Sequence, residues 1–482
     1  MAKQKFNPGH CVLAAWLSLF CCACAQLPGA QSDAVDDYMK AEIAKRHIPG
    51  AALIVIQHGQ IIKVQGYGVA TIEHDVPVIP DTVFELASVT KQFTAAAIML
   101  LVEENKVGLD DPVSRYLADT PDAWRGITVR HLLTHTAGFP GLDKGFATLT
   151  LWRANYTTAL LFASAKRDAL SFAPGERWQY SDVGYFLLGM IIEKVSEERY
   201  REFLANRFFQ PLGMTHTTVL DQWAIVKNLA AGYTLRKGET IRIRRISQVE
   251  LPSYGGVFST VNDLAKWESA LASGKVLQRA SLEQMWTAVK LNDGSSFPYG
   301  FGWGIDEIRG HRVISHTGIT GTQYSRYPDD GLTVIVLTNL GAFVGATEVY
   351  PWGLTSGVAG RYIPNLLVSS LAEQPLPDPQ MLEQAKGLLT AVAAGEDAPS
   401  MTPGLRKVIT PENRKFLAQR MNNLTSFTFI ACENVDGRVL EWFGARVSRL
   451  CYYKLRTPNE TRYYTFSLTA DGRVANFRSS LE

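Results

Sequence analysis

Hydrophobic and polar positions follow two different periods along the chain, and together they predict both strands and helices. Apolar runs with strand character lie at residues 51–57, 61–66, 301–305, 312–316 and 332–337. The first two flank His58-Gly59, which is typical of a hairpin, and the last two are expected on either side of a turn at Asp329-Asp330-Gly331. Helical patterns dominate between the two groups, and further helices are expected at 35–45 and 350–372. Strands at both ends of a segment with helices between them predict an antiparallel sheet that packs against a helical cluster.

The pattern changes at Glu373-Gln374-Pro375-Leu376-Pro377-Asp378-Pro379, where the proline content indicates a stiff linker over residues 373–380. Beyond it, two helices are expected at 380–394 and 411–421. Four or five short strand-like runs follow, and they are separated at Asp436-Gly437, Thr457-Pro458-Asn459 and Asp471-Gly472. Residues 381–482 are therefore predicted to form a compact α+β module. The module could cover a cleft, pair two subunits or bind a partner, and the sequence does not choose.

The N-terminus has the features of an export signal. Lys3 and Lys5 precede an apolar stretch at residues 11–20, and Ala23-Cys24-Ala25 matches a small-residue cleavage site. We predict a signal peptide over residues 1–25 and a main domain over 26–372. An uncleaved anchor is the alternative, but the stretch is short for a span, and no later segment has the ~18 apolar residues that a spanning helix needs. The mature protein is expected to be periplasmic or secreted, with no stable membrane span.

Composition narrows the class of protein and its compartment. The 482 residues are 46% hydrophobic and 20% charged, with a net charge of +2 and no basic run, so nucleic acid is not an expected partner. Four of the six cysteines belong to the predicted signal. Cys432 and Cys451 either form a disulfide in an oxidising compartment or remain two small buried residues, and the sequence leaves both open.

Candidate chemistry begins at Ser88-Val89-Thr90-Lys91, which opens a strongly helical run over residues 91–104. Residues three apart share a helix face, so Lys91 can stand beside the Ser88 hydroxyl and accept its proton. Free N–H groups at a helix start also help to hold developing negative charge. The alternative is that Ser88 caps the helix and Lys91 is solvated.

Two further motifs follow in order, Tyr180-Ser181-Asp182 and His316-Thr317-Gly318. With Ser88-x-x-Lys91 they resemble the serine β-lactamase and penicillin-binding-protein-like family, most closely its class C β-lactamase, D-Ala-D-Ala carboxypeptidase and esterase branch. The resemblance covers about residues 35–370, and further stretches support it at 131–138, 255–265 and 299–304. It implies a β-lactamase-like α+β fold.

The resemblance also implies a role for each motif residue. Ser88 attacks a carbonyl and becomes an acyl-enzyme, Lys91 and Tyr180 share the acid–base work, and no cofactor is needed. A nearby lysine cation is expected to lower the pKa of Tyr180. The implied catalytic set is Ser88, Lys91, Tyr180 and His316, the oxyanion hole is formed by the backbone N–H groups of Ser88 and Ile319, and the substrate-binding residues are Asp182, Thr317 and Gly318.

Two positions depart from the family pattern. Asp182 stands where asparagine is usual, and as an anion it favours the Lys91 cation and cannot donate an amide hydrogen bond. His316 stands where most β-lactamases carry a lysine, and a neutral imidazole binds a substrate carboxylate less well. Both departures argue against an efficient β-lactamase.

His131 and His135 have the i, i+4 spacing of a zinc pair. They belong to a helix-and-turn stretch that the family uses structurally, and the sequence shows no third ligand, so no metal is expected.

The sequence therefore predicts an exported serine hydrolase that acts through an acyl-enzyme on small esters or on D-amino-acid-type amides and peptides. A β-lactamase or D-Ala-D-Ala carboxypeptidase is the alternative, and a non-catalytic penicillin-binding sensor is the second alternative. The expected partner is a small-molecule or peptide substrate, and a homo-oligomer is left open.

Overall fold

The computed structural model describes residues 33–141, 156–219, 221, 223–236, 238–243, 249–341, 353–409, 411–440, 445–480 and 482. The predicted signal peptide, residues 1–25, lies outside this part of the chain. Among the helices of the described ranges, none is both long and apolar enough to cross a membrane.

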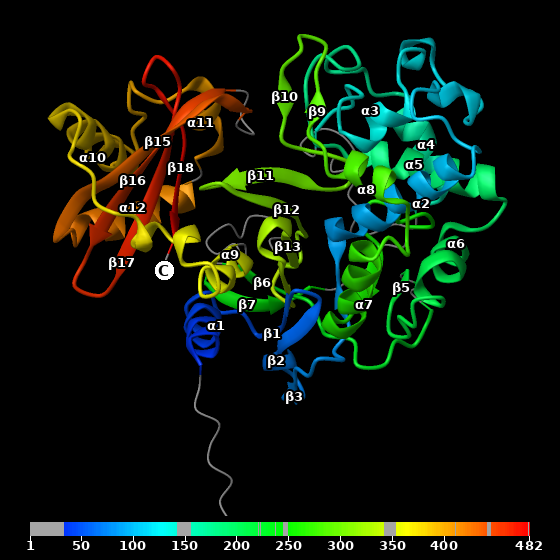
Figure 1. Cartoon of the computed structure of the whole chain (residues 1–482), viewed down its shortest axis with the longest axis horizontal. Coiled ribbons are helices and arrows are strands. Elements are labelled where there is room, and N and C mark those ends of the chain that lie inside the picture. Colours follow the sequence, from blue (N-terminus) through cyan, green and yellow to red (C-terminus); the bar gives the residue numbers. More distant parts are fainter. Residues whose placement is uncertain are drawn as a thin grey trace, which may run out of the picture.

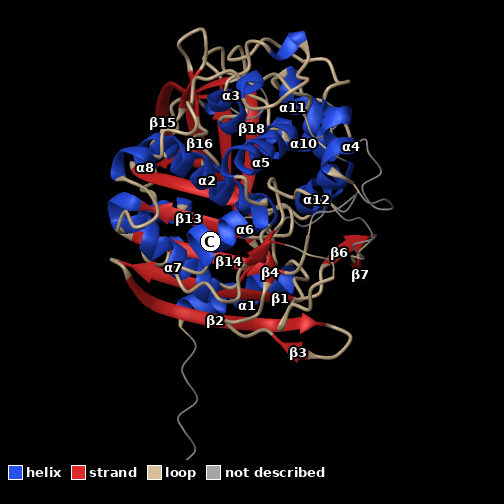
Figure 2. Cartoon of the chain, turned by 90° about the vertical axis from the view of Figure 1, so that its right-hand side faces the viewer, coloured by secondary structure: helices blue, strands red, loops and turns tan. Residues whose placement is uncertain are grey.

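A seven-stranded antiparallel sheet forms the centre of the molecule, with the strand order β11-β12-β13-β14-β1-β2-β3 (Figure 1). Its strands are β1 Gly50–Gln57, β2 Gln60–Thr71, β3 Val76–Pro77, β11 Gly304–Ile308, β12 His311–Thr317, β13 Gln323–Tyr327 and β14 Leu332–Thr338. The two ends of the domain meet where β1 pairs with β14, with Ala51 opposite Thr338. Figure 2 shows β2 and β3 at the lower edge of this sheet. The predicted antiparallel sheet with a helical cluster is confirmed.

Strand β13 is absent from the sequence prediction, which paired residues 312–316 directly with 332–337. β12 pairs with β13, and the turn at residues 328–331 joins β13 to β14 instead. The prediction was wrong because Gln-Tyr-Ser-Arg-Tyr reads as a polar loop, although all five residues of β13 are buried. Two of its polar side chains share one partner: the Tyr324 hydroxyl donates to Glu268, and Arg326 Nε donates to the same carboxylate. The strand expected at 301–305 also begins later, at Gly304.

Both faces of the sheet are covered by helices, and β1 alternates between two hydrophobic cores. Ala52, Ile54 and Ile56 face the larger core, whereas Ala51, Leu53 and Val55 face the smaller one. The helices of the larger core include α2 Lys91–Glu103, α3 Val129–Leu133, α4 Thr158–Ala165, α5 Asp182–Ser196, α6 Tyr200–Leu204, α7 Val261–Ala272 and α8 Arg279–Met285. The smaller core is closed by α1 Ala34–Lys45 and α9 Leu354–Ala359.

Short elements complete this domain. The helix expected at 350–372 is replaced by α9 and two 3-10 turns, Pro364–Leu366 and Val368–Ser370, and residues 350–352 lie outside the described ranges. Pro364 explains the difference, because proline lacks the N–H that a continuing helix needs. The short strands are β4 Phe84–Glu85, β5 Thr218–Val219, β6 Tyr233–Arg236, β7 Glu239–Arg242, β8 Val257–Ser259, β9 Val289–Lys290 and β10 Ser296–Phe297.

The C-terminal residues form a separate sheet with its own core (Figure 1, orange to red). Helices α10 Pro379–Ala393, α11 Pro403–Val408 and α12 Pro411–Asn422 precede the strands β15 Ser426–Leu440, β16 Arg446–Arg456, β17 Thr461–Leu468 and β18 Val474–Ser480. The sequence did not predict α11. The break expected at Asp436-Gly437 was also wrong, because β15 continues through it and takes up the irregularity as a register shift between Asn434 and Val439. Cys432 and Cys451 are opposed on β15 and β16 and form a disulfide, which resolves the two alternatives.

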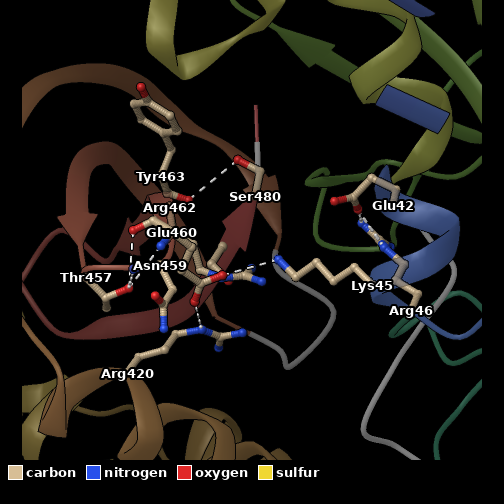
Figure 3. A network of polar contacts seen from close by, with 11 residues as sticks. Glu42, Lys45, Arg46, Arg420, Thr457, Asn459, Glu460, Arg462, Tyr463 and Ser480 are labelled. Atoms are coloured by element: carbon tan, nitrogen blue, oxygen red, sulfur yellow. Dashed lines mark hydrogen bonds and ion pairs between the residues drawn. The ribbon is translucent and has the colours of Figure 1, made fainter. Parts of the chain in front are cut away.

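One carboxylate links the C-terminal module to the main domain (Figure 3). Glu460, between β16 and β17, accepts from Lys45 of α1 at 3.2 Å, from Arg420 of α12 at 2.8 Å and from Arg462 of β17 at 2.9 Å. Burial by itself would raise the pKa of Glu460, but the three cations outweigh it and lower the pKa to about 2. The Arg309 guanidinium makes a second link, since it donates to the Leu366 carbonyl and lies 4.9 Å from the centre of the Tyr452 ring.

Candidate active site

Ser88 lies in a 3-10 turn, Ala87–Thr90, that leads directly into α2. Ala87 has a φ of 45°, in the left-handed region that non-glycine residues rarely adopt. Such backbone strain persists only where neighbours hold it, and here Leu86 donates its N–H to the Val257 carbonyl while Val257 donates to Thr90 Oγ1. The turn leaves Ser88 partly exposed, whereas Lys91 at the start of the helix is fully buried.

The Lys91 ammonium has three neighbours within hydrogen-bond distance. Its Nζ lies 3.3 Å from Ser88 Oγ, 2.8 Å from Asp182 Oδ1 and 2.7 Å from the Tyr254 carbonyl oxygen. Burial lowers the pKa of Lys91, and the Asp182 charge opposes this shift without reversing it. The sequence therefore placed Lys91 correctly beside Ser88, and Asp182 lies directly against the lysine.

Tyr180 comes two residues before α5, and its ring lies 4.8 Å from Lys91 Nζ. Its hydroxyl is buried, and within the described residues no partner lies at both the distance and the angle of a hydrogen bond. Burial and then the Asp182 charge raise the pKa of Tyr180 well above 10, and only the nearby Ser88 hydroxyl opposes them. The expectation that the lysine lowers this pKa was wrong, because burial disfavours the phenolate and the Asp182 charge disfavours it further.

The third motif lies at the end of β12, in a tight turn where Gly318 donates its N–H to the Thr322 carbonyl at 2.8 Å. A Cβ at Gly318 would stand 2.4 Å from the Leu86 carbonyl oxygen, so only glycine allows this approach. Thr320 Oγ1 also donates to the Glu85 carbonyl at 2.8 Å. These contacts hold the turn that carries Ile319 against the segment that carries Ser88. Ile319 is 39% exposed, and Thr317 is exposed as well.

His316 is buried, and both of its ring nitrogens have partners. Nδ1 lies 2.8 Å from the Thr317 carbonyl oxygen, and Nε2 lies 3.0 Å from the Tyr299 hydroxyl. Burial, followed by the Lys91 charge, lowers the pKa of His316 to about 3, so the ring is neutral at physiological pH.

The two histidines of the sequence pair do not face each other. His131 accepts from the Thr128 N–H at the start of α3, while His135 lies inside the site, where its Nε2 is 3.2 Å from the Tyr299 hydroxyl. Within the described residues, no group of three or more histidine, cysteine or acidic side chains is arranged to hold a metal ion.

Three residues of the site were given no part in the catalytic site by the sequence: His135, which was weighed only as a zinc ligand, Tyr254 and Tyr299. His135 and Tyr299 fall in stretches that support the family resemblance, so their position was noticed but not their contacts. Tyr254 contributes a backbone carbonyl, for which no side-chain signal exists in the sequence.

The antiparallel sheet with its helical cluster, and a serine, lysine and tyrosine brought together beside it, match the arrangement expected of the penicillin-binding-protein-like class of proteins. The Beta-lactamase family model matches residues 34–349, and the chain belongs to this family.

Among curated proteins, the chain is 31% identical to Penicillin-binding protein 4* of Bacillus subtilis over 319 residues, which span 62% of this chain and 69% of that one. Protein flp of Staphylococcus aureus is 28% identical over 320 residues, spanning 64% of this chain and 62% of that protein, so the match leaves over a third of it uncovered.

Solved structures share the fold. The octameric penicillin-binding protein homologue from Pyrococcus abyssi is 22% identical with a TM-score of 0.59, and the match covers 93% of this chain and 95% of that one. EstCE1, a hydrolase with promiscuous acyltransferase activity, is 24% identical with a TM-score of 0.59, covering 68% and 97%. D-amino acid amidase from Ochrobactrum anthropi is 25% identical with a TM-score of 0.59, covering 69% and 99%.

Proposed function

We propose that this protein is a serine hydrolase that forms an acyl-enzyme on Ser88, with small esters or D-amino-acid-type amides and peptides as substrates. One observation carries the proposal: a buried lysine amine lies 3.3 Å from the hydroxyl of a partly exposed serine. A serine hydroxyl is a weak nucleophile until a neighbouring base removes its proton.

The neighbours of Lys91 support its assignment as that base. Asp182 and the Tyr254 carbonyl can only accept hydrogen bonds, so a neutral Lys91 amine donates its two hydrogens to them. Its lone pair is then directed toward Ser88. Asp182 therefore orients the base. Burial lowers the pKa of Lys91, which makes the neutral amine easier to form.

Tyr180 is the general acid in this scheme. Ser88 Oγ bonds to the substrate carbonyl carbon while its proton passes to Lys91, and the backbone N–H groups of Ser88 and Ile319 stabilise the resulting oxyanion. When the carbon–leaving-group bond breaks, the Tyr180 hydroxyl protonates the leaving oxygen or nitrogen and recovers a proton from Lys91. Water then attacks the acyl carbon and gives up a proton, the bond between that carbon and Ser88 Oγ breaks, and the proton passes to Ser88 Oγ as the acid product leaves. Because the pKa of Tyr180 is raised, its hydroxyl is protonated before the reaction and suits a proton donor better than a general base.

Charge at the third motif bears on the substrate. His316 is neutral and its nitrogens are engaged, so this position offers no cation to a substrate carboxylate. Uncharged esters and amides are therefore favoured over penicillins and peptides with a free terminal carboxylate. The hydrolase EstCE1 and the D-amino acid amidase among the solved structures support this substrate range. Exposed Thr317, the Gly318 turn and Asp182 are the residues that we assign to substrate binding.

We extend the proposal to the organisation of the chain. A signal peptide over residues 1–25 delivers a domain over 26–372 to the periplasm or the exterior, and the linker 373–380 joins it to the module 381–482. The octameric homologue supports a homo-oligomer.

The test compares the mature wild-type protein with Ser88→Ala. We expect wild type to hydrolyse a p-nitrophenyl ester and Ser88→Ala to lose this turnover while unfolding at the same temperature. Hydrolysis by Ser88→Ala at the wild-type rate would refute the proposal. Intact mass after incubation with a penicillin then separates the alternatives: no adduct supports esters and amides, a penicilloyl adduct on wild type alone favours D-Ala-D-Ala peptides, and an adduct without any turnover of ester or peptide favours the sensor.

A further inference from the structure

An unbroken line of hydrogen bonds connects the second motif to the third through two residues that carry no assigned role. The Ser181 N–H donates to His135 Nδ1 at 3.3 Å, and His135 Nε2 lies 3.2 Å from the Tyr299 hydroxyl. The same hydroxyl lies 3.0 Å from His316 Nε2, and His316 Nδ1 lies 2.8 Å from the Thr317 carbonyl oxygen. His135, Tyr299 and His316 are all less than a tenth exposed.

The two ends of this line determine where each proton lies. A carbonyl oxygen only accepts, so His316 Nδ1 carries the hydrogen, and Nε2 of the neutral ring accepts from the Tyr299 hydroxyl. The Tyr299 oxygen then accepts from His135 Nε2–H. His135 Nδ1 is left as an acceptor, and a backbone N–H at Ser181 is the donor that it meets. Each hydrogen bond has one donor and one acceptor, and the two histidines hold opposite tautomers.

His135 also fixes the backbone on both sides of Tyr180. Its carbonyl oxygen accepts from the Gln179 N–H at 2.9 Å, and its Nδ1 accepts from the Ser181 N–H. Its ring lies against the Tyr180 ring, with 4.4 Å between the centroids. His135 itself has a φ of 59°, a left-handed conformation that persists only when its surroundings hold it.

We propose that His135 and Tyr299 are positioning residues: they hold Tyr180 in place and lock His316 as the neutral Nδ1–H tautomer, which leaves His316 no free nitrogen for the substrate. His316 is then a positioning residue too, rather than an acid or base. The catalytic consequence rests on the proposed function, whereas the tautomers do not depend on any activity.

The direct test is 15N NMR of wild-type protein labelled with 15N-histidine, with His135→Gln and His316→Asn used only to assign signals. We expect His316 to be protonated at Nδ1, His135 to be protonated at Nε2, and neither ring to titrate between pH 5 and pH 8. Two Nε2–H rings, or a ring that titrates in this range, would overturn the proposal whether or not the protein hydrolyses any ester.

The matched perturbation is Tyr299→Phe, which removes one hydroxyl from the middle of the line. We expect it to release His316 Nε2, change the His316 nitrogen shifts and lower kcat by about 10- to 100-fold, with KM changed by less than about threefold, because misplaced catalytic groups cost rate more than binding. The control is Tyr200→Phe, a buried tyrosine whose hydroxyl lies 2.6 Å from Thr94 Oγ1 and takes no part in the line.

Three outcomes decide the proposal. Loss of kcat and altered His316 shifts in Tyr299→Phe, but not in Tyr200→Phe, support it. Equal losses in both variants, or unchanged His316 shifts in Tyr299→Phe, refute it. If Ser88→Ala shows that hydrolysis does not depend on Ser88, the proposed function fails, and the NMR result still decides the tautomers.

Discussion

The contact between Lys91 and Asp182 gives the sharpest prediction, because replacing Asp182 with asparagine changes charge and almost nothing else. The variant keeps an oxygen acceptor for Lys91 Nζ, which now lies 2.8 Å from Asp182 Oδ1. Lys91 is fully buried and the Asp182 side chain is 21% exposed, so the lost attraction is only partly screened.

A hydrogen bond between charged groups contributes about 1.5–3 kcal/mol, and about 1.4 kcal/mol corresponds to one pH unit. Without the carboxylate, the Lys91 cation loses that stabilisation and its pKa falls further. Lys91 must be neutral to accept the Ser88 proton. The acidic limb of the pH profile of kcat/KM should therefore move to lower pH by about one to two pH units.

The assay is the pH dependence of kcat/KM for a p-nitrophenyl ester in wild type and Asp182→Asn. Asp330→Asn is a matched control, because the Asp330 side chain is 20% exposed and is hydrogen-bonded to His311 rather than to Lys91. We expect the control to leave the profile unchanged. An acidic limb that stays in place, or moves to higher pH, in Asp182→Asn would contradict the assignment of Lys91 as the base.

Two further predictions concern stability. Glu460→Gln should lower the free energy of unfolding by about 1–3 kcal/mol at pH 7, after allowance for its partial exposure. Because the pKa of Glu460 is lowered to about 2, this stabilisation is present above the ordinary pKa of 4.5 and is lost as the pH falls from there toward 2. Denaturant unfolding at several pH values measures it, and a difference that does not shrink in acid would exclude the charge effect. Replacing Cys432 and Cys451 together with serine should cost about 3 kcal/mol, as expected for a bridge with a sequence separation of 19. Unfolding of the C-terminal module under reducing and non-reducing conditions checks this value, and equal stability in both would refute it.

Sequence patterns predicted the features that neighbouring residues determine. They failed for features that depend on residues far away along the chain. Ser88 and Lys91 are one helical turn apart, so their proximity follows from the helix. Strand β13 was missed because its burial depends on Glu268, a residue of α7 that pairs with two of its side chains. The pKa of Tyr180 was predicted in the wrong direction, because neither its burial nor the position of Asp182 can be derived from local sequence. The Asp436-Gly437 turn signal was overridden by pairing with β16.

The pairing of β1 with β14 has a consequence for when the protein can fold during its synthesis. Ala51 lies opposite Thr338, so the sheet closes only after most of the chain has been synthesised. Closing so long a loop makes the entropic cost of the first contact high and folding slow compared with a chain of local contacts. The serine, the tyrosine and the third motif come from segments far apart in the sequence, and that same late step brings the third motif to the other two. A nascent chain therefore carries Ser88, Lys91 and Tyr180 before the third motif has joined them, and the complete site forms only when the two ends of the sheet have met.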